Sequence, residues 1–367
     1  MKFFEKLSYY RYNPHMYEVS SRYRKKRKKT NLLNVAVIGC GGGGMMHMSH
    51  YIWHEKTNLK YVFDIDSNRF NDLHKRFPFA YKDIKKTSKI DDLINDESID
   101  IVSVATPDHT HAKYAIMALD AGKNVLCEKP MCTSIEDMKK MINAVNSSNK
   151  KFSVFQQMRF TPKNAKAFEF IKNGKLGELF YIRTEYIHDM RKRATEFSNW
   201  RKDPKTFQHP IYGGQHNIDL IRWLAGDIIE VNAISTGKSF PNYPIDDTFT
   251  IQAKFNNGCI GDIVTSYGPI VPKEFHLLNI YGTKGTMHNN NIYFEEGSLI
   301  KNTSLDDAEY KGVPQFRDQI TSFVNCVLND RDKGLVSVLD GAKTVMVIEA
   351  CLESLKTGKP SKVGEID

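Results

Sequence analysis

The stretch VAVIGCGGGGMMH, residues 35–47, is the most informative pattern in the first part of this chain. Apolar, mostly β-branched residues lead directly into five glycines, and the segment after them (residues 45–56) has a helical pattern. Gly39, Gly41 and Gly44 form G-x-G-x-x-G between this predicted strand and helix, a context that separates a dinucleotide site from chance. The first glycine permits a tight turn, the second lets backbone approach a pyrophosphate, and the third allows close packing. The stretch therefore predicts phosphates held at a helix N-terminus.

The segments that follow alternate between strand and helix patterns. Strands are predicted at 34–39, 59–66, 100–106 and 124–130, and helices at 45–56, 72–77 and 111–122. This alternation predicts a parallel sheet covered by helices. From about residue 156 the pattern changes to longer segments of alternating polarity, such as residues 246–267, whose NNG sequence is a hairpin signal. We therefore expect a basic arm at 1–34, a Rossmann domain at 35–155, and a second, sheet-rich domain at 156–367.

Composition narrows the class of protein. The 367 residues suffice for about two domains of ~150 residues. With 41% hydrophobic and 26% charged residues the chain has a globular composition, and no apolar run approaches the ~20 residues of a membrane span. The six cysteines are scattered without a C-x-x-C pair, which argues against a zinc site or a disulfide framework and predicts a reducing, cytoplasmic setting.

The net charge of +9 is concentrated in the first 34 residues, which hold ten Lys or Arg and two acids. Most of it lies in RYRKKRKK, residues 22–29. Short blocks of like charge are usually solvated tails, so we favour a solvated or partner-packed arm. Contact of the arm with an anionic membrane surface is the alternative. The remainder of the chain is nearly neutral, and we expect no nucleic-acid partner.

A longer segment, ATPDHTHAKYAIMALDAGKNVLCEKPM (residues 105–131), carries T-P-x-x-x-H and E-K-P motifs. It resembles the middle of the Gfo/Idh/MocA family, the glucose–fructose oxidoreductases and inositol dehydrogenases. Further resembling segments follow in family order at 156–162, 173–179, 213–227, 281–287 and 346–360. The resemblance implies an α/β protein: an N-terminal Rossmann doubly wound parallel sheet, then an α/β domain with a large, mostly antiparallel open sheet. That sheet would carry the substrate pocket and the contacts of a homodimer or homotetramer.

Hydride transfer from a secondary alcohol needs a base for the hydroxyl proton and a positive group beside the oxygen. Lys129, at the end of a predicted strand, matches the family's catalytic lysine and lies where open α/β sheets bind ligands. His216, in GGQHNIDLIRW, matches the family's acid/base histidine, whose ordinary pKa near 6.5 suits proton transfer. The alternatives are a surface lysine and a core histidine.

The cofactor is expected to be NAD, with NADP less favoured. Asp64 ends the second predicted strand, where its carboxylate can accept the ribose hydroxyls and would repel a 2′-phosphate. Together with Asp64, the cofactor-binding candidates are Gly39, Gly41, Gly42, Gly44, Met45, Thr106, Pro107, His111, Glu128 and Lys129. The resemblance also implies a cis peptide bond between Lys129 and Pro130.

The substrate side departs from the family at one position. Relatives often have an aspartate four residues before the histidine, but this chain has Tyr212 there, which leaves the substrate open. Asp219 either binds substrate, orients its neighbours or is simply a polar helix residue. The substrate-binding candidates are Arg159, Trp200, Arg201, Tyr212, His216 and Asp219.

A metal site is not expected. The helical triplet His47, His50 and His54 has no acidic or cysteine partner at matching spacing. Hydride chemistry with a dinucleotide also needs no metal.

These observations predict an NAD-dependent oxidoreductase that transfers a hydride between nicotinamide and a secondary alcohol of a sugar, cyclitol or nucleotide-sugar. A redox-neutral NAD-dependent glycosidase and a dinucleotide-binding sensor are the alternatives. The presence of both Lys129 and His216 argues against a sensor.

Overall fold

The computed structural model describes residues 31–190, 200, 211, 214–239, 245–270, 275–296, 299–304 and 314–366. Almost all of the predicted basic arm lies outside these ranges, as do Arg201, Tyr212 and most of the loop at 191–212. Among the described residues, every helix is too short or too polar to cross a membrane.

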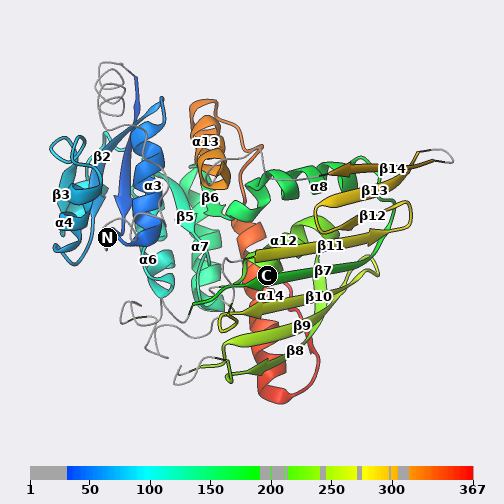
Figure 1. Ribbon diagram of the computed structural model, residues 1–367. Coiled ribbons are helices and arrows are strands. Elements are labelled where there is room, and N and C mark those ends of the chain that lie inside the picture. Colours follow the sequence, from blue (N-terminus) through cyan, green and yellow to red (C-terminus); the bar gives the residue numbers. More distant parts are fainter. Residues whose placement is uncertain are drawn as a thin grey trace.

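The first sheet has six parallel strands in the order β3-β2-β1-β4-β5-β6, which confirms the predicted doubly wound sheet (Figure 1). The strands are β1 (Leu33–Ile38), β2 (Thr57–Phe63), β3 (Lys85–Thr87), β4 (Ile101–Val104), β5 (Asn124–Glu128) and β6 (Phe152–Phe155). The connecting helices are α3 (Gly42–Trp53), α4 (Arg69–Arg76), α5 (Asp91–Ile94), α6 (His111–Asp120) and α7 (Ile135–Ser148), with short 3₁₀ turns η2 (Asp108–Thr110) and η3 (Gln157–Phe160). The carboxyl ends of β1, β4 and β5 therefore meet at one edge of the sheet.

Helix α3 begins at Gly42, three residues before the predicted start. Glycine has a low intrinsic helix propensity, so the pattern alone places the start at the first methionine. Tertiary packing overrides that preference, because Gly44 must lie against the turn at Gly39.

The second sheet has nine described strands in the order β14-β13-β12-β11-β7-β10-β9-β8-β15. All neighbours are antiparallel except the parallel pair β7–β10. The predicted NNG hairpin joins β9 to β10. The strands are β7 (Leu179–Ile187), β8 (Ile228–Thr236), β9 (Thr248–Phe255), β10 (Ile260–Ser266), β11 (Phe275–Gly282), β12 (Gly285–His288), β13 (Asn291–Glu296), β14 (Leu299–Ser304) and β15 (Ser361–Lys362). Helix α8 (Pro162–Lys172) leads into this sheet from η3.

The helices α12 (His216–Ala225) and α14 (Val338–Thr357) contact one face of the second sheet, and no described helix covers the other face, hereafter the uncovered face (Figure 1). Residues late in the sequence also complete the first core. Helix α13 (Pro314–Leu328) contributes Phe323 to the cluster around β1 and α3. Helix α14 contributes Val345 to the core around β4 and β5, and Ile348 to the core of the second sheet. The two domains therefore share one helix.

Candidate functional site

The glycine-rich turn has the geometry that its spacing predicts. Gly39 has φ +101°, and a Cβ there would lie 2.4 Å from the carbonyl oxygen of Ala105, at the end of β4. A Cβ on Gly44 would lie 1.8 Å from the carbonyl oxygen of Gly39. A Cβ on Gly41 would meet no atom within 4 Å. Two glycines are therefore required by packing, whereas Gly41 faces open space at the start of α3.

The neighbouring cofactor-binding candidates differ in their exposure and in their hydrogen bonds. Gly42 is exposed as the first residue of α3. Met45 is buried in the core, and its N–H donates to the carbonyl of Gly41, so neither its side chain nor its N–H faces solvent. Asp64 follows β2, and its two oxygens accept the N–H groups of Cys40 and Asp66 at 2.8 and 2.9 Å. This carboxylate is thereby fixed beside the glycine-rich turn.

Lys129 and Pro130 follow β5 and are joined by a cis peptide bond, which confirms the expectation from the family resemblance. His111, at the start of α6, lies beside this turn, with Nδ1 2.6 Å from the Pro130 carbonyl oxygen and Nε2 2.9 Å from that of Thr106. Thr106 Oγ1 in turn accepts a hydrogen bond from Thr110. Pro107 precedes η2 in the same loop. The ring of His111 is thus occupied by backbone carbonyls.

Glu128, the last residue of β5, lies against the first turn of α3. A Cβ on Gly43 would be 3.6 Å from its Oε1. The same oxygen is 3.2 Å from Nε2 of His47, and Oε2 accepts the N–H of Lys129. Burial raises the pKa of Glu128, but the hydrogen bond and charge of His47 and the charge of Lys129 outweigh burial and lower it overall. The group is therefore a carboxylate at neutral pH.

His216 is the first residue of α12 and is buried. Burial holds its pKa well below the usual range, and the charge of Lys129 lowers it further. Its Nδ1 is buried and has no hydrogen-bond partner among the described residues. The imidazole is therefore neutral and can accept a proton. The effect of Lys129 on its pKa also means that the two sequence-predicted catalytic residues, one from each domain, lie within electrostatic reach of each other.

A second group beside His216 was missed from the sequence. The ring of Tyr186 lies 5.8 Å from that of His216 and stacks on His276 at 4.6 Å. Its hydroxyl is 3.1 Å from Nδ1 of His188. Tyr186 and His188 lie at and just beyond the end of β7, and His276 lies near the start of the antiparallel β11. The only sequence signal for this group is the spacing of Tyr186 and His188, which places both on one side of a strand end. The sequence does not show that β11, with His276, pairs with that strand.

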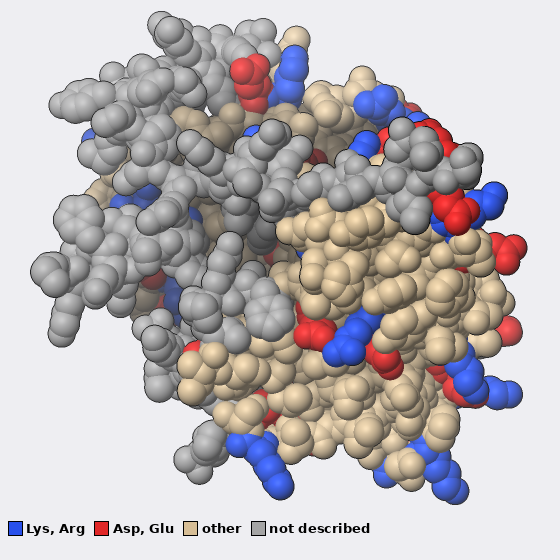
Figure 2. Space-filling model, turned by 45° about the vertical axis from the view of Figure 1, so that its right-hand side comes forward, with Lys and Arg blue, Asp and Glu red and all other residues tan. Residues whose placement is uncertain are grey.

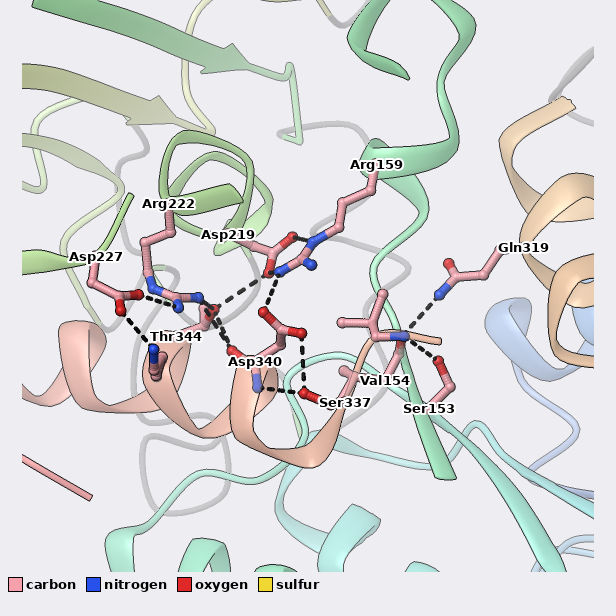
Figure 3. Close-up of polar contacts among 12 residues, drawn as sticks. Ser153, Val154, Arg159, Asp219, Arg222, Asp227, Gln319, Ser337, Asp340 and Thr344 are labelled. Atoms are coloured by element: carbon pink, nitrogen blue, oxygen red, sulfur yellow. Dashed lines mark hydrogen bonds and ion pairs between the residues drawn. The ribbon is translucent and has the colours of Figure 1, made fainter. Parts of the chain in front are cut away.

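Arg159 and Asp219, both predicted as substrate-binding candidates, form an ion pair with each other (Figure 3). Nε and Nη2 of Arg159 donate to the two oxygens of Asp219 at 2.8 and 2.7 Å, and Nη2 is 3.5 Å from Asp340 of α14. Asp219 is fully buried and also accepts from Thr344. The structure thus favours the interpretation in which Asp219 orients its neighbours, because its carboxylate is buried and both of its oxygens are held by Arg159.

The same cluster extends along α12 and α14 (Figure 3). Arg222, one turn after Asp219, donates to Thr344, the Asp340 carbonyl and Asp227. Asp227 also accepts from Lys343. The helix that begins at His216 is therefore tied by side chains to η3 and to α14.

Of the remaining substrate candidates, Trp200 is described, and its ring lies 6.3 Å from that of His109 in η2. It therefore lies beside the loop that carries Thr106 and Pro107. Arg201 and Tyr212 lie outside the described residues. Among the described residues, no three His, Cys, Asp or Glu side chains are grouped to hold a metal.

A parallel Rossmann sheet with this turn and a second, open sheet define an NAD(P)-dependent oxidoreductase of two domains. Residues 33–156 match the model of an oxidoreductase family with an NAD-binding Rossmann fold, and residues 169–363 match the model of that family's C-terminal alpha/beta domain. The chain belongs to the Gfo/Idh/MocA oxidoreductase family.

Curated relatives include levoglucosan dehydrogenase from Pseudarthrobacter phenanthrenivorans, which is 28% identical over 317 residues, covering 76% of this chain and 78% of the relative. The 2,7-anhydro-N-acetylneuraminate hydratase of Escherichia coli is 25% identical over 262 residues, covering 70% and 67%. Among solved structures, levoglucosan dehydrogenase in complex with NADH and levoglucosan superposes with a TM-score of 0.79 at 23% identity, covering 91% of this chain and 100% of that one. Myo-inositol 2-dehydrogenase from Lactobacillus plantarum gives 0.77 at 22% identity, with the same coverage. The last two likenesses concern the fold alone.

Proposed function

We propose that this protein transfers a hydride between NAD and a secondary alcohol of a sugar, cyclitol or nucleotide-activated sugar. The observation that carries this proposal is that Lys129 and the buried His216, one from each domain, lie within electrostatic reach of each other; burial holds the pKa of His216 low, and the charge of Lys129 lowers it further. An unprotonated base beside a cation is what alcohol oxidation requires.

The residues of the glycine-rich turn fit a dinucleotide. The open space before Gly41 leaves room for a pyrophosphate against the first N–H groups of α3, and the carboxylate of Asp64 lies beside the turn at the position of the ribose hydroxyls. The negative charge of Asp64 supports NAD over NADP. When bound, the nicotinamide supplies the hydride acceptor.

Alcohol oxidation would also require the substrate hydroxyl to lose its proton as the hydride leaves the same carbon. Nδ1 of His216, buried and without a partner among the described residues, accepts that proton. The ammonium group of Lys129 stabilises the negative charge that develops on the oxygen. In the reverse direction, His216 returns the proton to the carbonyl oxygen as hydride arrives.

The substrate class follows from the family and from what surrounds His216. The curated relative named levoglucosan dehydrogenase is named for a polyhydroxylated ring. In this chain the ring of Trp200, beside His109, offers an apolar face on which such a ring could stack. With Tyr212 at the position where relatives often have aspartate, we propose a hydroxyl pattern different from that of inositol dehydrogenases.

The test is NADH formation by the purified protein with NAD⁺ and a panel of polyols that includes levoglucosan and myo-inositol. His216→Ala should lower turnover on the order of 10²–10⁴-fold. Lys129→Ala and Lys129→Arg should both lose turnover while binding NAD⁺ normally, because arginine carries the charge on a differently shaped group. Lys140→Ala, an exposed lysine paired with Glu136, is the control. Normal turnover by Lys129→Ala would rule out this mechanism.

A redox-neutral reaction is the second candidate, since one curated relative is named as a hydratase of an anhydro sugar. The NADH-formation assay distinguishes net oxidation from a redox-neutral reaction. Net oxidation accumulates NADH, whereas a redox-neutral cycle consumes the sugar while NADH absorbance stays flat.

We also propose that two copies of the chain associate through the uncovered face of the second sheet. Figure 2 shows this side of the molecule as a broad surface with few charged groups. Tyr181, Ile234 and Ile260 point away from the helix-covered face, and Ile234 and Ile260 are 63% and 54% exposed. Exposed apolar area of this kind marks an interaction surface.

A further inference from the structure

The turn Glu128–Lys129–Pro130 is held on one side by His47, which comes from the second turn of α3. His47 is completely buried. Its Nδ1 is 2.6 Å from the hydroxyl of Ser103 on β4, and its Nε2 is 3.2 Å from Glu128. Because a carboxylate only accepts, Nε2 carries a proton and donates to Glu128, and Nδ1 is engaged with the Ser103 hydroxyl. Both ring nitrogens are therefore held.

His111 holds the same turn on its other side. It is 1% exposed, and both ring nitrogens lie at hydrogen-bond distance from backbone carbonyls, those of Pro130 and Thr106. Carbonyl oxygens only accept, so an N–H of the ring can donate to either of the two carbonyls, and the ring fills the space between them. His111 therefore connects the residue after Lys129 to the loop that follows β4.

We propose that His47 and His111 are positioning residues that together fix the direction in which Lys129 leaves the sheet. Both nitrogens of each ring are already engaged and buried, so neither histidine touches cofactor or substrate. One binds the side chain of the residue before Lys129, and the other binds the carbonyl of the residue after it. The inference rests on the proposed role of Lys129 in the reaction.

The link through Glu128 also joins the cofactor helix to the catalytic lysine. Oε1 of Glu128 binds His47 on α3, and Oε2 accepts the backbone N–H of Lys129. A lysine side chain has a long, flexible stem, so its ammonium group is directed only as well as its backbone is held. Misplacement of a reacting group by about 1 Å can cost on the order of 10²-fold in rate.

The experiment measures Lys129 directly. The NAD⁺-bound protein is treated with limiting acetic anhydride over a range of pH, and mass spectrometry gives the acetylation rate of Lys129 relative to exposed lysines. In His47→Leu and His111→Leu the relative acetylation rate of Lys129 should change several-fold, and its pH dependence should shift. His50→Leu is the matched control, because His50 lies one turn after His47 on the same helix, within reach of the charges of His47 and Arg317, and its replacement removes a histidine from this helix without changing the residue that binds Glu128. His50→Leu should leave the Lys129 profile unchanged.

Two further measurements separate positioning from general damage. With the polyol that the wild type oxidises, His47→Leu and His111→Leu should lower kcat by on the order of 10- to 100-fold with little change in NAD⁺ affinity. In a Lys129→Ala background the same substitutions should lower kcat no further. If His47→Leu does not fold, His47→Asn keeps a polar group beside Ser103 but is too short to reach Glu128. His47→Gln, which can still donate to Glu128, should restore part of the loss.

An unchanged Lys129 acetylation profile in folded His47 and His111 variants would overturn the inference. Full turnover by Lys129→Ala would instead overturn the proposed function, and the acetylation profile would still report whether the histidines position Lys129.

Discussion

Asp64 shows how much one side chain can determine. Its carboxylate accepts N–H groups from both the glycine-rich turn and Asp66, so it is held in place before any ligand binds. Asp64→Ser removes the charge that opposes a 2′-phosphate. We expect the preference for NAD⁺ over NADP⁺ to narrow by about tenfold, a change of about 1.4 kcal/mol. Isothermal titration with both dinucleotides measures it.

Asp66→Ser is the control for this prediction, because the side chain of Asp66 accepts hydrogen bonds from Asn68, whereas that of Asp64 accepts from Cys40 in the glycine-rich turn. The preference of Asp66→Ser for NAD⁺ over NADP⁺ should remain that of the wild type. A wild-type protein that binds NADP⁺ more tightly than NAD⁺ would contradict the role given to Asp64.

The pKa of His216 gives a second prediction for a single residue. Lys129→Gln removes a positive charge that disfavours the imidazolium form, so the pKa of His216 should rise toward its ordinary value of 6.5. Because burial is the larger cause of the lowering, the rise should be incomplete. An NMR titration of the histidine ring protons measures it, with His74 on α4 as the internal reference. An unaltered His216 titration would mean that the two groups are not coupled.

In the turn between β1 and α3, one glycine is needed for binding and another for folding. Gly41→Ala meets no atom within 4 Å and keeps an ordinary φ of −75°, so the protein should fold with an unchanged melting temperature. The added methyl group would occupy the space next to the phosphates, so NAD⁺ affinity should fall by on the order of tenfold or more. Gly44→Ala should instead destabilise the fold, because its Cβ would clash with the Gly39 carbonyl. Thermal unfolding and NAD⁺ titration of both variants check this contrast.

The contact between η3 and α12 gives the next prediction. Asp219→Ala leaves the buried Arg159 guanidinium without its bidentate partner, which should cost about 3–5 kcal/mol of unfolding free energy. The double variant Arg159→Met/Asp219→Leu should be less destabilised than Asp219→Ala, because no buried charge is left unpaired. Urea unfolding measures both. Lys166→Ala, which breaks an exposed ion pair with Glu169, should change stability by less than about 1 kcal/mol.

The sequence predicts well those features that depend on local pattern. β1, α3 and β2 follow from apolar runs and glycine spacing, and the β9–β10 hairpin follows from its NNG turn. Strand β3 is three polar residues, KKT, which carry no such pattern and pair only because β2 is beside them. The Arg159–Asp219 pair joins residues far apart in the chain. No periodicity signals it, so the family resemblance predicts Arg159 as a substrate-binding residue and leaves the role of Asp219 open between substrate, its neighbours and a polar helix position.

For the whole molecule, the uncovered sheet face predicts the assembly. Ile234→Lys together with Ile260→Lys places two charges on that face, which should turn an oligomer into a monomer without loss of folding, since both side chains are exposed in one copy. Light scattering after size-exclusion chromatography measures the mass. Leu339→Lys, an exposed apolar residue on α14, is the control and should leave the mass unchanged. A wild-type protein that is already a monomer would contradict the proposed interface.

The helices α13 and α14 have a consequence for how the protein is made. The core around β1 and α3 includes Phe323, and that around β4 and β5 includes Val345, yet the last strand of the first sheet ends at Phe155. On a ribosome that adds about 5–20 residues per second, the first domain would emerge roughly 10–40 s before the helices that complete it. During that interval its apolar surface would lie open to chaperones, and the nascent domain could not close until almost the whole chain had been synthesised.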